Sequence, residues 1–229
     1  MIAPPGLERF RGFVRRLSLL AFLAIGVSSL AFAAPEKWAK AIDEFTGTDA
    51  KIPALRSDAV FVGSSSIVKW TTLAQDFPGL KVLNRGFGGS ELGDSVFYAE
   101  RIVTPHQPRF VVLYAGDNDL NAGKTPETVH ADFQAFVAKV HAKLSRARIV
   151  FIAIKPSPSR WEIREKAERA NALIAAECAK DERLRFVDIW KPMLDEKGEP
   201  RRDLFVADML HINAAGYAIW TPLVAAELK

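Results

Sequence analysis

Three consecutive serines, Ser64, Ser65 and Ser66, follow an apolar run in the segment FVGSSSIVKW. A serine hydroxyl becomes an effective nucleophile only when a base accepts its proton, an acid orients that base and hydrogen-bond donors stabilise the oxyanion that forms. The serines alone therefore establish no activity. The rest of the chain must supply a histidine, a carboxylate and an oxyanion site.

The chain has four histidines that can be compared as candidate bases. His130 and His141 fall on an expected helix with no carboxylate arranged to fix a tautomer, and we expect both at the surface. His106 lies in the proline-bounded loop TPHQP before a predicted strand, at the opposite edge of the sheet from a strand-end site. His211 follows Asp208 by three residues, so one ring nitrogen could meet the carboxylate while the other faces a serine. The same D-x-x-H spacing also occurs in ordinary turns that enter a helix.

The glycine-rich segment NRGFGGSELGD offers backbone N–H groups that could bind an oxyanion or a phosphate. The dinucleotide pattern G-x-G-x-x-G fails because Glu91 stands at the place of the third glycine after Gly86 and Gly88. The P-loop pattern fails because Asp94, not lysine, follows Gly93. A plain tight turn would have the same composition.

The segment AGDNDLNAG also raises two possibilities. Asp117, Asp119 and Asn121 match the first ligand positions of an EF-hand calcium loop, but Ala122 stands where that loop requires glycine. Asn118 is a neutral amide donor of the type found in oxyanion holes. We therefore expect no metal here and take Asn118 as a candidate oxyanion donor.

The elements that must position these residues are five short apolar runs with helical patterns between them. Most runs are continuous rather than alternating, as expected for strands covered on both faces. Strand alternating with helix predicts one doubly wound α/β domain with a mainly parallel sheet, whose ligands bind beyond the carboxyl ends of the strands. The predicted strands are 58–63, 80–84, 109–116, 148–154 and 184–190.

Two helices are clearest in the pattern of apolar residues. The first is predicted from Pro126 to Leu144, with Thr125 as its cap, and the second from Trp161 to Lys180. Cys178 lies on the apolar stripe of the second helix and is interpreted as a small buried side chain rather than a reactive thiol. Asn213 can cap the final helix just beyond His211.

The segment KPSPSRW, residues 155–161, follows the fourth predicted strand. Lys155 or Arg160 could meet an anionic headgroup, and Trp161 could stack on a sugar. The alternative is a solvated helix entrance, which we favour for all three residues because charged side chains are rarely buried.

Residues 1–33 have the three parts of an export signal: a start with four arginines, an apolar middle from Leu17 to Leu30 and small residues before Ala34. We expect this leader to be cleaved and the remaining chain to be periplasmic or secreted, without stable insertion into a membrane. Cleavage lowers the formal charge from +4 to +1, since four arginines and one glutamate leave with the leader. A nucleic-acid partner is therefore not expected.

Taken in order, the segments GSSS, GFGGS, GDND and DMLH resemble the four signature blocks of the SGNH (GDSL) hydrolases. The resemblance covers residues 61–217 and implies a flavodoxin-like, three-layer α/β/α domain over residues 34–229, with a mainly parallel five-stranded sheet. It implies that Ser65 is the nucleophile, that Asp208 and His211 complete a triad, and that Gly89 and Asn118 join the Ser65 N–H in the oxyanion hole. Ser64 departs from the family, which has aspartate at that place.

The resemblance implies a serine esterase that cleaves short, acetyl-like acyl esters through an acyl-enzyme on Ser65, without a metal or cofactor. Its expected partner is a small-molecule, glycan or lipid ester. A lysophospholipase or thioesterase of the same family, an acyltransferase and a non-catalytic carbohydrate-binding domain on the same fold are the alternatives.

Overall fold

The structure is a computed structural model that describes Met1 and residues 36–52 and 55–229. The leader predicted over residues 1–33 lies outside the described residues apart from Met1, so its cleavage and the export of the chain stay predictions. From Glu36 onward the described residues belong to one compact unit.

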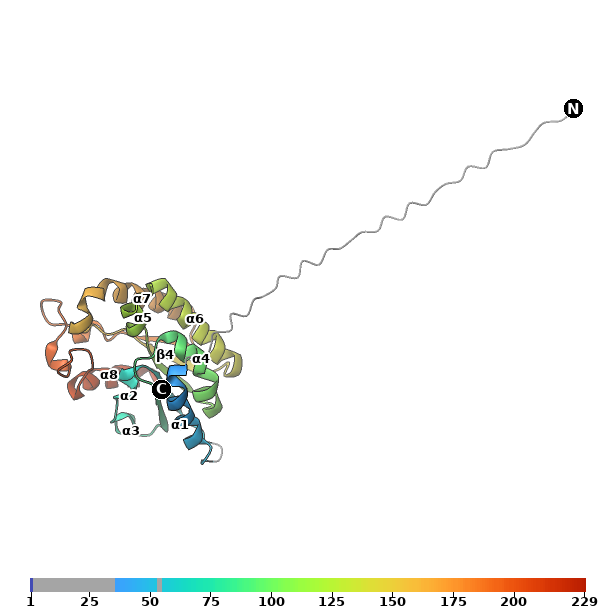
Figure 1. The fold of residues 1–229 in the computed structure, drawn as a ribbon, viewed down its shortest axis with the longest axis horizontal. Helices are drawn as coiled ribbons and strands as arrows, with labels where there is room; N and C mark the ends of the chain where they lie inside the picture. The colour runs from blue at the N-terminus through green and yellow to red at the C-terminus, as the bar shows by residue number, and fades with distance from the viewer. Residues whose placement is uncertain (2–35, 53–54) are drawn as a thin grey trace. The chain divides into compact units, whose positions relative to one another are not determined.

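A five-stranded sheet with every pair of neighbouring strands parallel forms the centre of this unit, as the sequence predicts (Figure 1). The order β2-β1-β3-β4-β5 places β1 and β3 side by side, with Gly63 opposite Tyr114. The loops that follow these two strands therefore leave the sheet together. The strands are β1 (Ala59–Gly63), β2 (Val82–Gly86), β3 (Phe110–Tyr114), β4 (Arg148–Ile152) and β5 (Leu184–Val187).

The second strand begins and ends two residues later than the predicted range 80–84. Arg85 and Gly86 have the composition of a loop but continue the strand, because they pair with Val62 and Gly63 of β1. The Arg85 side chain is buried and forms an ion pair with Asp49, which compensates its charge in the interior. A long-range partner thus decides where this strand ends.

Helices cover both faces of the sheet, and successive strand residues pack against opposite layers. Val60 and Val62 point into a core shared with one set of helices, whereas Ala59 and Phe61 point into the core of the other set. In Figure 1, α4, α6 and α7 lie together along one side. The first layer comprises α1 (Ala39–Asp49), α4 (Leu92–Ile102), α6 (Pro126–Lys143) and α7 (Arg164–Cys178), and the second comprises α2 (Ser65–Val68), α3 (Leu73–Asp76) and α8 (Ala214–Glu227).

The two predicted helices are confirmed with shifted boundaries: α6 ends at Lys143 rather than Leu144, and α7 ends at Cys178 rather than Lys180. Thr125 caps α6 by accepting a hydrogen bond from the Thr128 N–H, and Cys178 is buried at the end of α7. The helix predicted from Trp161 is instead a 3₁₀ segment, η3 (Pro158–Ile163), followed by α7, because Arg160 has non-helical dihedral angles. The remaining short elements are η1 (Glu36–Trp38), η2 (Thr104–His106), α5 (Asp117–Asn121), η4 (Lys191–Met193) and η5 (Arg202–Leu204).

None of the helices in the described part of the chain is long and apolar enough to cross a bilayer.

Gly63 ends β1 at a point where no larger residue fits. Its φ of +135° is unfavourable for any residue with a Cβ, and a Cβ built there would lie 1.9 Å from the Tyr114 carbonyl oxygen. The glycine therefore lets β1 approach the end of β3 closely just before the serine loop begins.

We expect Gly63→Ala to lower the free energy of unfolding by at least about 3 kcal/mol, because backbone strain and a backbone clash add. Urea denaturation of the folded protein measures this loss. Gly198→Ala is the matched control: Gly198 also has positive φ, at +79°, but open space around it, so about 1 kcal/mol is expected. Equal losses in the two variants would contradict the close-approach argument.

Candidate active site

Ser65 is the first residue of α2 and immediately follows the strand-end turn at Gly63 and Ser64. The turn is held by backbone: the Ser64 N–H donates to the Tyr114 carbonyl at 3.0 Å, and the Ser64 carbonyl accepts from Ile67 N–H at 2.9 Å. The Ser64 hydroxyl is buried without a hydrogen-bond partner in the described residues. Main-chain hydrogen bonds therefore hold the position at which the family has aspartate, and a serine forms these bonds as well as an aspartate does.

Of the three serine hydroxyls, that of Ser65 lies 2.9 Å from His211 Nε2, across 146 residues of sequence. The Ser66 hydroxyl is buried and, like that of Ser64, has no hydrogen-bond partner within the described ranges. Ser65 is half-buried, so its hydroxyl has access to both the histidine and the surface. The geometry therefore distinguishes Ser65 from its neighbours.

His211 is held from its other side by Asp208. Nδ1 lies 2.6 Å from Asp208 Oδ2, while Asp208 Oδ1 accepts hydrogen bonds from the backbone N–H groups of Leu210 and His211 at 2.9 Å each. These bonds, the His211 side chain first, hold the pKa of Asp208 below its usual value. An ionised carboxylate only accepts, so Nδ1 carries the proton and Nε2 is left to accept from the serine hydroxyl. This is the arrangement of a general base oriented by an acid.

The loop that carries this pair has its own local support. Met209 takes a left-handed conformation with φ of 55°, which turns the chain between Asp208 and His211. Asn213 then caps α8 by accepting from the N–H groups of Ala215 and Gly216, as predicted. The D-x-x-H spacing thus belongs both to a helix-entry turn and to a hydrogen-bonded acid–base pair.

The backbone of the glycine-rich loop passes beside Ser65 at Gly88. A Cβ built at Gly88 would lie 3.9 Å from the Ser65 Cβ, so this backbone runs against the serine. Gly89 has φ of +77° and is exposed. Within the described residues, neither the Ser65 N–H nor the Gly89 N–H donates to a protein acceptor. Both donors therefore remain free for an oxyanion.

Asn118 lies in the first turn of α5, directly after β3, with its amide fixed at both ends. Nδ2 donates to the Ser90 carbonyl at 2.8 Å, and Oδ1 accepts from Arg160 Nη2 at 3.0 Å. An amide nitrogen carries two N–H groups, so one remains after the bond to Ser90. The side chain can thus act as the third oxyanion donor that the sequence predicts.

A buried ionic cluster lies directly behind Asn118. Lys155 Nζ donates to Asp117 Oδ2 and to the Tyr114 hydroxyl, each at 2.9 Å, and Arg160 Nη1 lies 3.1 Å from Asp117 Oδ2. Burial alone would raise the pKa of Asp117, but the two cations hold it below its usual value. Burial raises the pKa of Tyr114 to about 12. The prediction of a solvated side chain is wrong for Lys155, which is buried, and Arg160 is half-buried rather than fully solvated, because a carboxylate at the neighbouring strand end compensates both charges.

A second buried carboxylate, Asp119, connects the glycine-rich loop that carries Gly89 to the start of α5, which carries Asn118. It accepts from the Leu92 N–H at the start of α4 and from Lys124 Nζ at 2.9 Å. Burial raises the pKa of Asp119 to about 6 despite the opposing charge of Lys124. In the sequence, Asp119 matches only a calcium-ligand position. In the described part of the chain no cluster of His, Cys, Asp and Glu suited to a metal ion is found.

The other three histidines lie elsewhere in the fold. His106 is buried at the amino end of β3 and pairs with Asp49, at the predicted opposite edge of the sheet. His130 and His141 are half-buried on α6 rather than fully at the surface, with contacts to Glu177 and to the Ala147 carbonyl.

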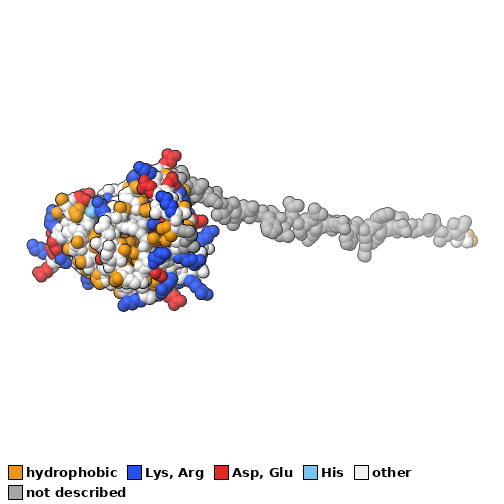
Figure 2. Space-filling view, turned by 90° about the horizontal axis from the view of Figure 1, so that it is seen from below, with side chains coloured by type: hydrophobic (Ala, Val, Ile, Leu, Met, Phe, Trp, Pro, Cys, Tyr) orange, Lys and Arg blue, Asp and Glu red, His pale blue; other side chains and the backbone are white. Residues whose placement is uncertain are grey.

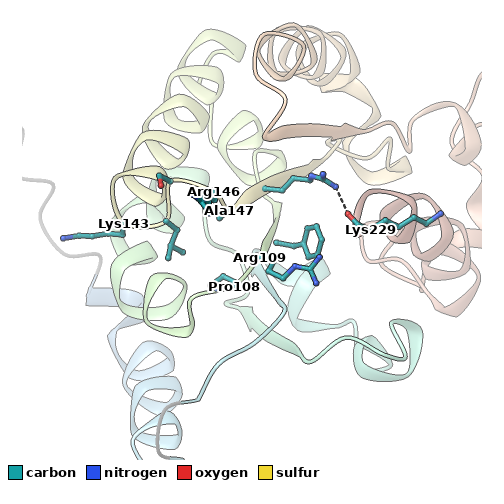
Figure 3. Close-up of a pocket in the computed structure, with 10 residues that line it drawn as sticks. Pro108, Arg109, Lys143, Arg146, Ala147 and Lys229 are labelled. Atoms are coloured by element: carbon teal, nitrogen blue, oxygen red, sulfur yellow. Dashed lines mark hydrogen bonds between the residues drawn. The ribbon is translucent and has the colours of Figure 1, made fainter.

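A shallow hollow of about 470 Å³ lies at the amino edge of the sheet, away from the triad (Figure 3). Arg109, Phe110 and Arg148 line it, and Arg148 donates a hydrogen bond to the Lys229 carbonyl at 3.1 Å. None of the triad residues lines this hollow. On the face that Figure 2 presents, basic and acidic side chains are interspersed around the outline of the domain.

We expect Lys124→Met to lower the free energy of unfolding by about 3 kcal/mol at pH 8, because Asp119 then lies buried without its cation. Loss of the cation raises the pKa of Asp119 further above its unfolded value. The stability that a raised carboxyl pKa contributes is present at low pH and is lost as the pH rises through the pKa of the folded state. The decrease in the free energy of unfolding caused by Lys124→Met should therefore be smaller at pH 5 than at pH 8.

Thermal unfolding at the two pH values, with exposed Lys69→Met as the matched control, measures this difference. A loss at pH 5 as large as that at pH 8 would contradict the role assigned to the pair.

Comparison with known proteins shows the family of the chain. The model of the family described as GDSL-like Lipase/Acylhydrolase matches residues 57–219. Platelet-activating factor acetylhydrolase IB subunit alpha1 from Pongo abelii is 30% identical over 170 residues, which cover 70% of this chain and 71% of that protein.

Solved structures share the fold at lower identity. A protein from Streptococcus pneumonia superposes with a TM-score of 0.72 at 18% identity, covering 85% of this chain and 96% of that one. A GDSL-like lipase from Bacteroides thetaiotaomicron has a TM-score of 0.68 at 19% identity, covering 82% and 96%. The fold, the family match and the curated relative lead to one conclusion: this chain belongs to the GDSL-like lipase/acylhydrolase family and is an ester-hydrolysing enzyme.

Proposed function

We propose that the enzyme cleaves short acyl esters, with acetyl esters foremost, through an acyl-enzyme on Ser65. The observation that carries this proposal is the continuous chain of contacts from Ser65 Oγ through His211 to Asp208. Such a chain supplies the nucleophile, the base and the orienting acid that an ester cleavage requires. The alternative of a non-catalytic binding domain would not need it.

The reaction follows from these contacts in two halves. His211 Nε2 takes the proton of the Ser65 hydroxyl as Oγ attacks the ester carbonyl carbon. The π electrons of the carbonyl move to its oxygen, which becomes an oxyanion. The N–H groups of Ser65 and Gly89 and the amide of Asn118 stabilise that oxyanion. Collapse of the intermediate breaks the bond to the alcohol, which leaves with the proton from His211. Water then repeats the sequence on the acyl-enzyme and releases the carboxylic acid.

The preference for a short acyl group rests on the openness of the site. Gly88, Gly89 and Asp208 are exposed, and His211 is half-buried, so the reacting atoms lie near the surface. A long alkyl chain gains affinity chiefly by burial, at roughly 0.8 kcal/mol per CH₂ group, and an open site offers little of it. The curated relative from Pongo abelii is named an acetylhydrolase, which supports the same preference.

We expect Ser65→Ala to lower kcat for p-nitrophenyl acetate by at least about 10⁴-fold, because the triad acts as a unit. Ser66→Ala is the matched control: it removes a neighbouring hydroxyl that makes no hydrogen bond in the described residues, so its kcat should stay within about threefold of the wild type. Steady-state hydrolysis by the purified variants measures both. Residual turnover by Ser65→Ala equal to that of Ser66→Ala would rule out Ser65 as the nucleophile.

Chain length tests the second half of the proposal in the same assay. With p-nitrophenyl acetate, butyrate and octanoate, kcat/KM should fall as the acyl chain lengthens. A maximum at octanoate would reject the short-acyl preference and favour the lysophospholipase or thioesterase alternative, while leaving the role of Ser65 intact.

A further inference from the structure

We infer that Arg160 is a positioning residue for the oxyanion donor Asn118, and that Asp117 holds Arg160 in place. The inference rests on the proposed function, because the orientation of Asn118 affects turnover only if Ser65 forms a tetrahedral intermediate. It concerns an arginine outside the four sequence blocks and a carboxylate that takes no part in the triad. Its evidence is the set of contacts between η3 and the start of α5.

The Asn118 amide has one orientation that satisfies both of its neighbours. Nδ2 donates to the Ser90 carbonyl at 2.8 Å, and Oδ1 accepts from Arg160 at 3.0 Å. A rotation of the amide by 180° would place its oxygen against the Ser90 carbonyl oxygen, so that two acceptors face each other. It would also place the amide nitrogen against the Arg160 guanidinium, so that two donors face each other. Arg160 therefore helps to ensure that an N–H, and not the amide oxygen, is available to the developing oxyanion.

The charge of Arg160 also affects the strength of this donor. A hydrogen bond from a guanidinium is charge-assisted, and it withdraws electron density from the amide oxygen. Polarisation through connected hydrogen bonds strengthens each of them, by about 10–30% per bond. The remaining N–H of Asn118 thus becomes a better donor at the moment when negative charge forms on the substrate.

Asp117 fixes the guanidinium from behind. Its Oδ2 lies 3.1 Å from Arg160 Nη1 and 2.9 Å from Lys155 Nζ, and its side chain is 9% exposed. A carboxylate so buried is stable only with cations around it, and it restricts where those cations can lie. Lys155 alone would continue to compensate Asp117 if Arg160 lost its charge, which makes Arg160 open to substitution without unfolding.

The segment that carries Arg160 also contacts the loop that carries Asp208 and His211. The Ser159 N–H donates to the Met209 carbonyl at 3.1 Å, between Asp208 and His211. This short stretch of η3 therefore contacts Asn118 through the Arg160 side chain and the loop of Asp208 and His211 through the Ser159 backbone. The non-helical backbone at Arg160 permits both contacts within two residues.

We expect Arg160→Met to lower kcat for p-nitrophenyl acetate by about 10- to 100-fold with KM changed less than twofold, because only the transition state carries the oxyanion. Loss of the donor itself in Asn118→Ala should cost about 10² to 10³. That value is an upper limit for a residue that acts only through Asn118. Methionine keeps the apolar stem of the side chain, and far-UV circular dichroism checks that the variant is folded.

The coupling between the two residues is the decisive readout. In the Asn118→Ala background, Arg160→Met should lower kcat by less than twofold, since there is no amide left to position. Arg160→Lys should recover part of the lost rate, because it restores a charged donor but not the paired geometry. Arg164→Met is the matched control: Arg164 contacts Trp161 and makes no contact with Asn118, so kcat should be unchanged.

Three results would overturn the inference and leave the proposed function standing, provided that Ser65→Ala remains inactive. These are full kcat in Arg160→Met, an equal fold-loss from Arg160→Met with and without Asn118, and a raised KM at unchanged kcat, which would assign Arg160 to substrate binding. Full activity of Ser65→Ala would instead reject the proposed function itself.

Discussion

The contact between His211 Nε2 and Ser65 Oγ joins residues 146 positions apart, so it forms only when the whole sheet is assembled. Ser65 is placed by the end of β1, which Gly63 allows to approach Tyr114 of β3. His211 is placed by the turn before α8, a helix that packs on the face of the sheet covered by α2. The parallel arrangement brings both to the same edge, because the carboxyl ends of all five strands point one way.

Two buried carboxylates beside Asn118 impose a further constraint on this edge. Asp117 is compensated by Lys155 and Arg160, and Asp119 by Lys124. Buried ion pairs add little net stability, but an unpaired charge in the same place is strongly destabilising. The two aspartates therefore fix the positions of cations that come from other segments. Through Leu92 and Arg160 they also fix the glycine-rich loop and the Asn118 amide.

The sequence predicts the fold well because apolar runs and their spacing are local signals. The residues themselves make His211, Asp208 and Asn118 candidates for the site, and the resemblance adds Ser65 as the nucleophile and Gly89 as an oxyanion donor. The sequence fails for Lys155 and Arg160, whose composition indicates solvent exposure. Lys155 is buried and Arg160 half-buried because both pair with Asp117, 38 residues before Lys155, and a local pattern does not show such a partner. The one available signal is the pair of aspartates that directly follows a buried strand, since buried carboxylates require cations nearby.

The central claim is that Ser65 is a serine activated by His211, and covalent labelling tests it most directly. A fluorophosphonate reacts with an activated serine hydroxyl and largely ignores ordinary ones. After treatment of the folded enzyme, peptide mapping across Ser64, Ser65 and Ser66 should find a single adduct on Ser65, and His211→Ala should abolish it. No adduct on the folded protein, or an adduct on Ser65 that persists in His211→Ala, would contradict the account.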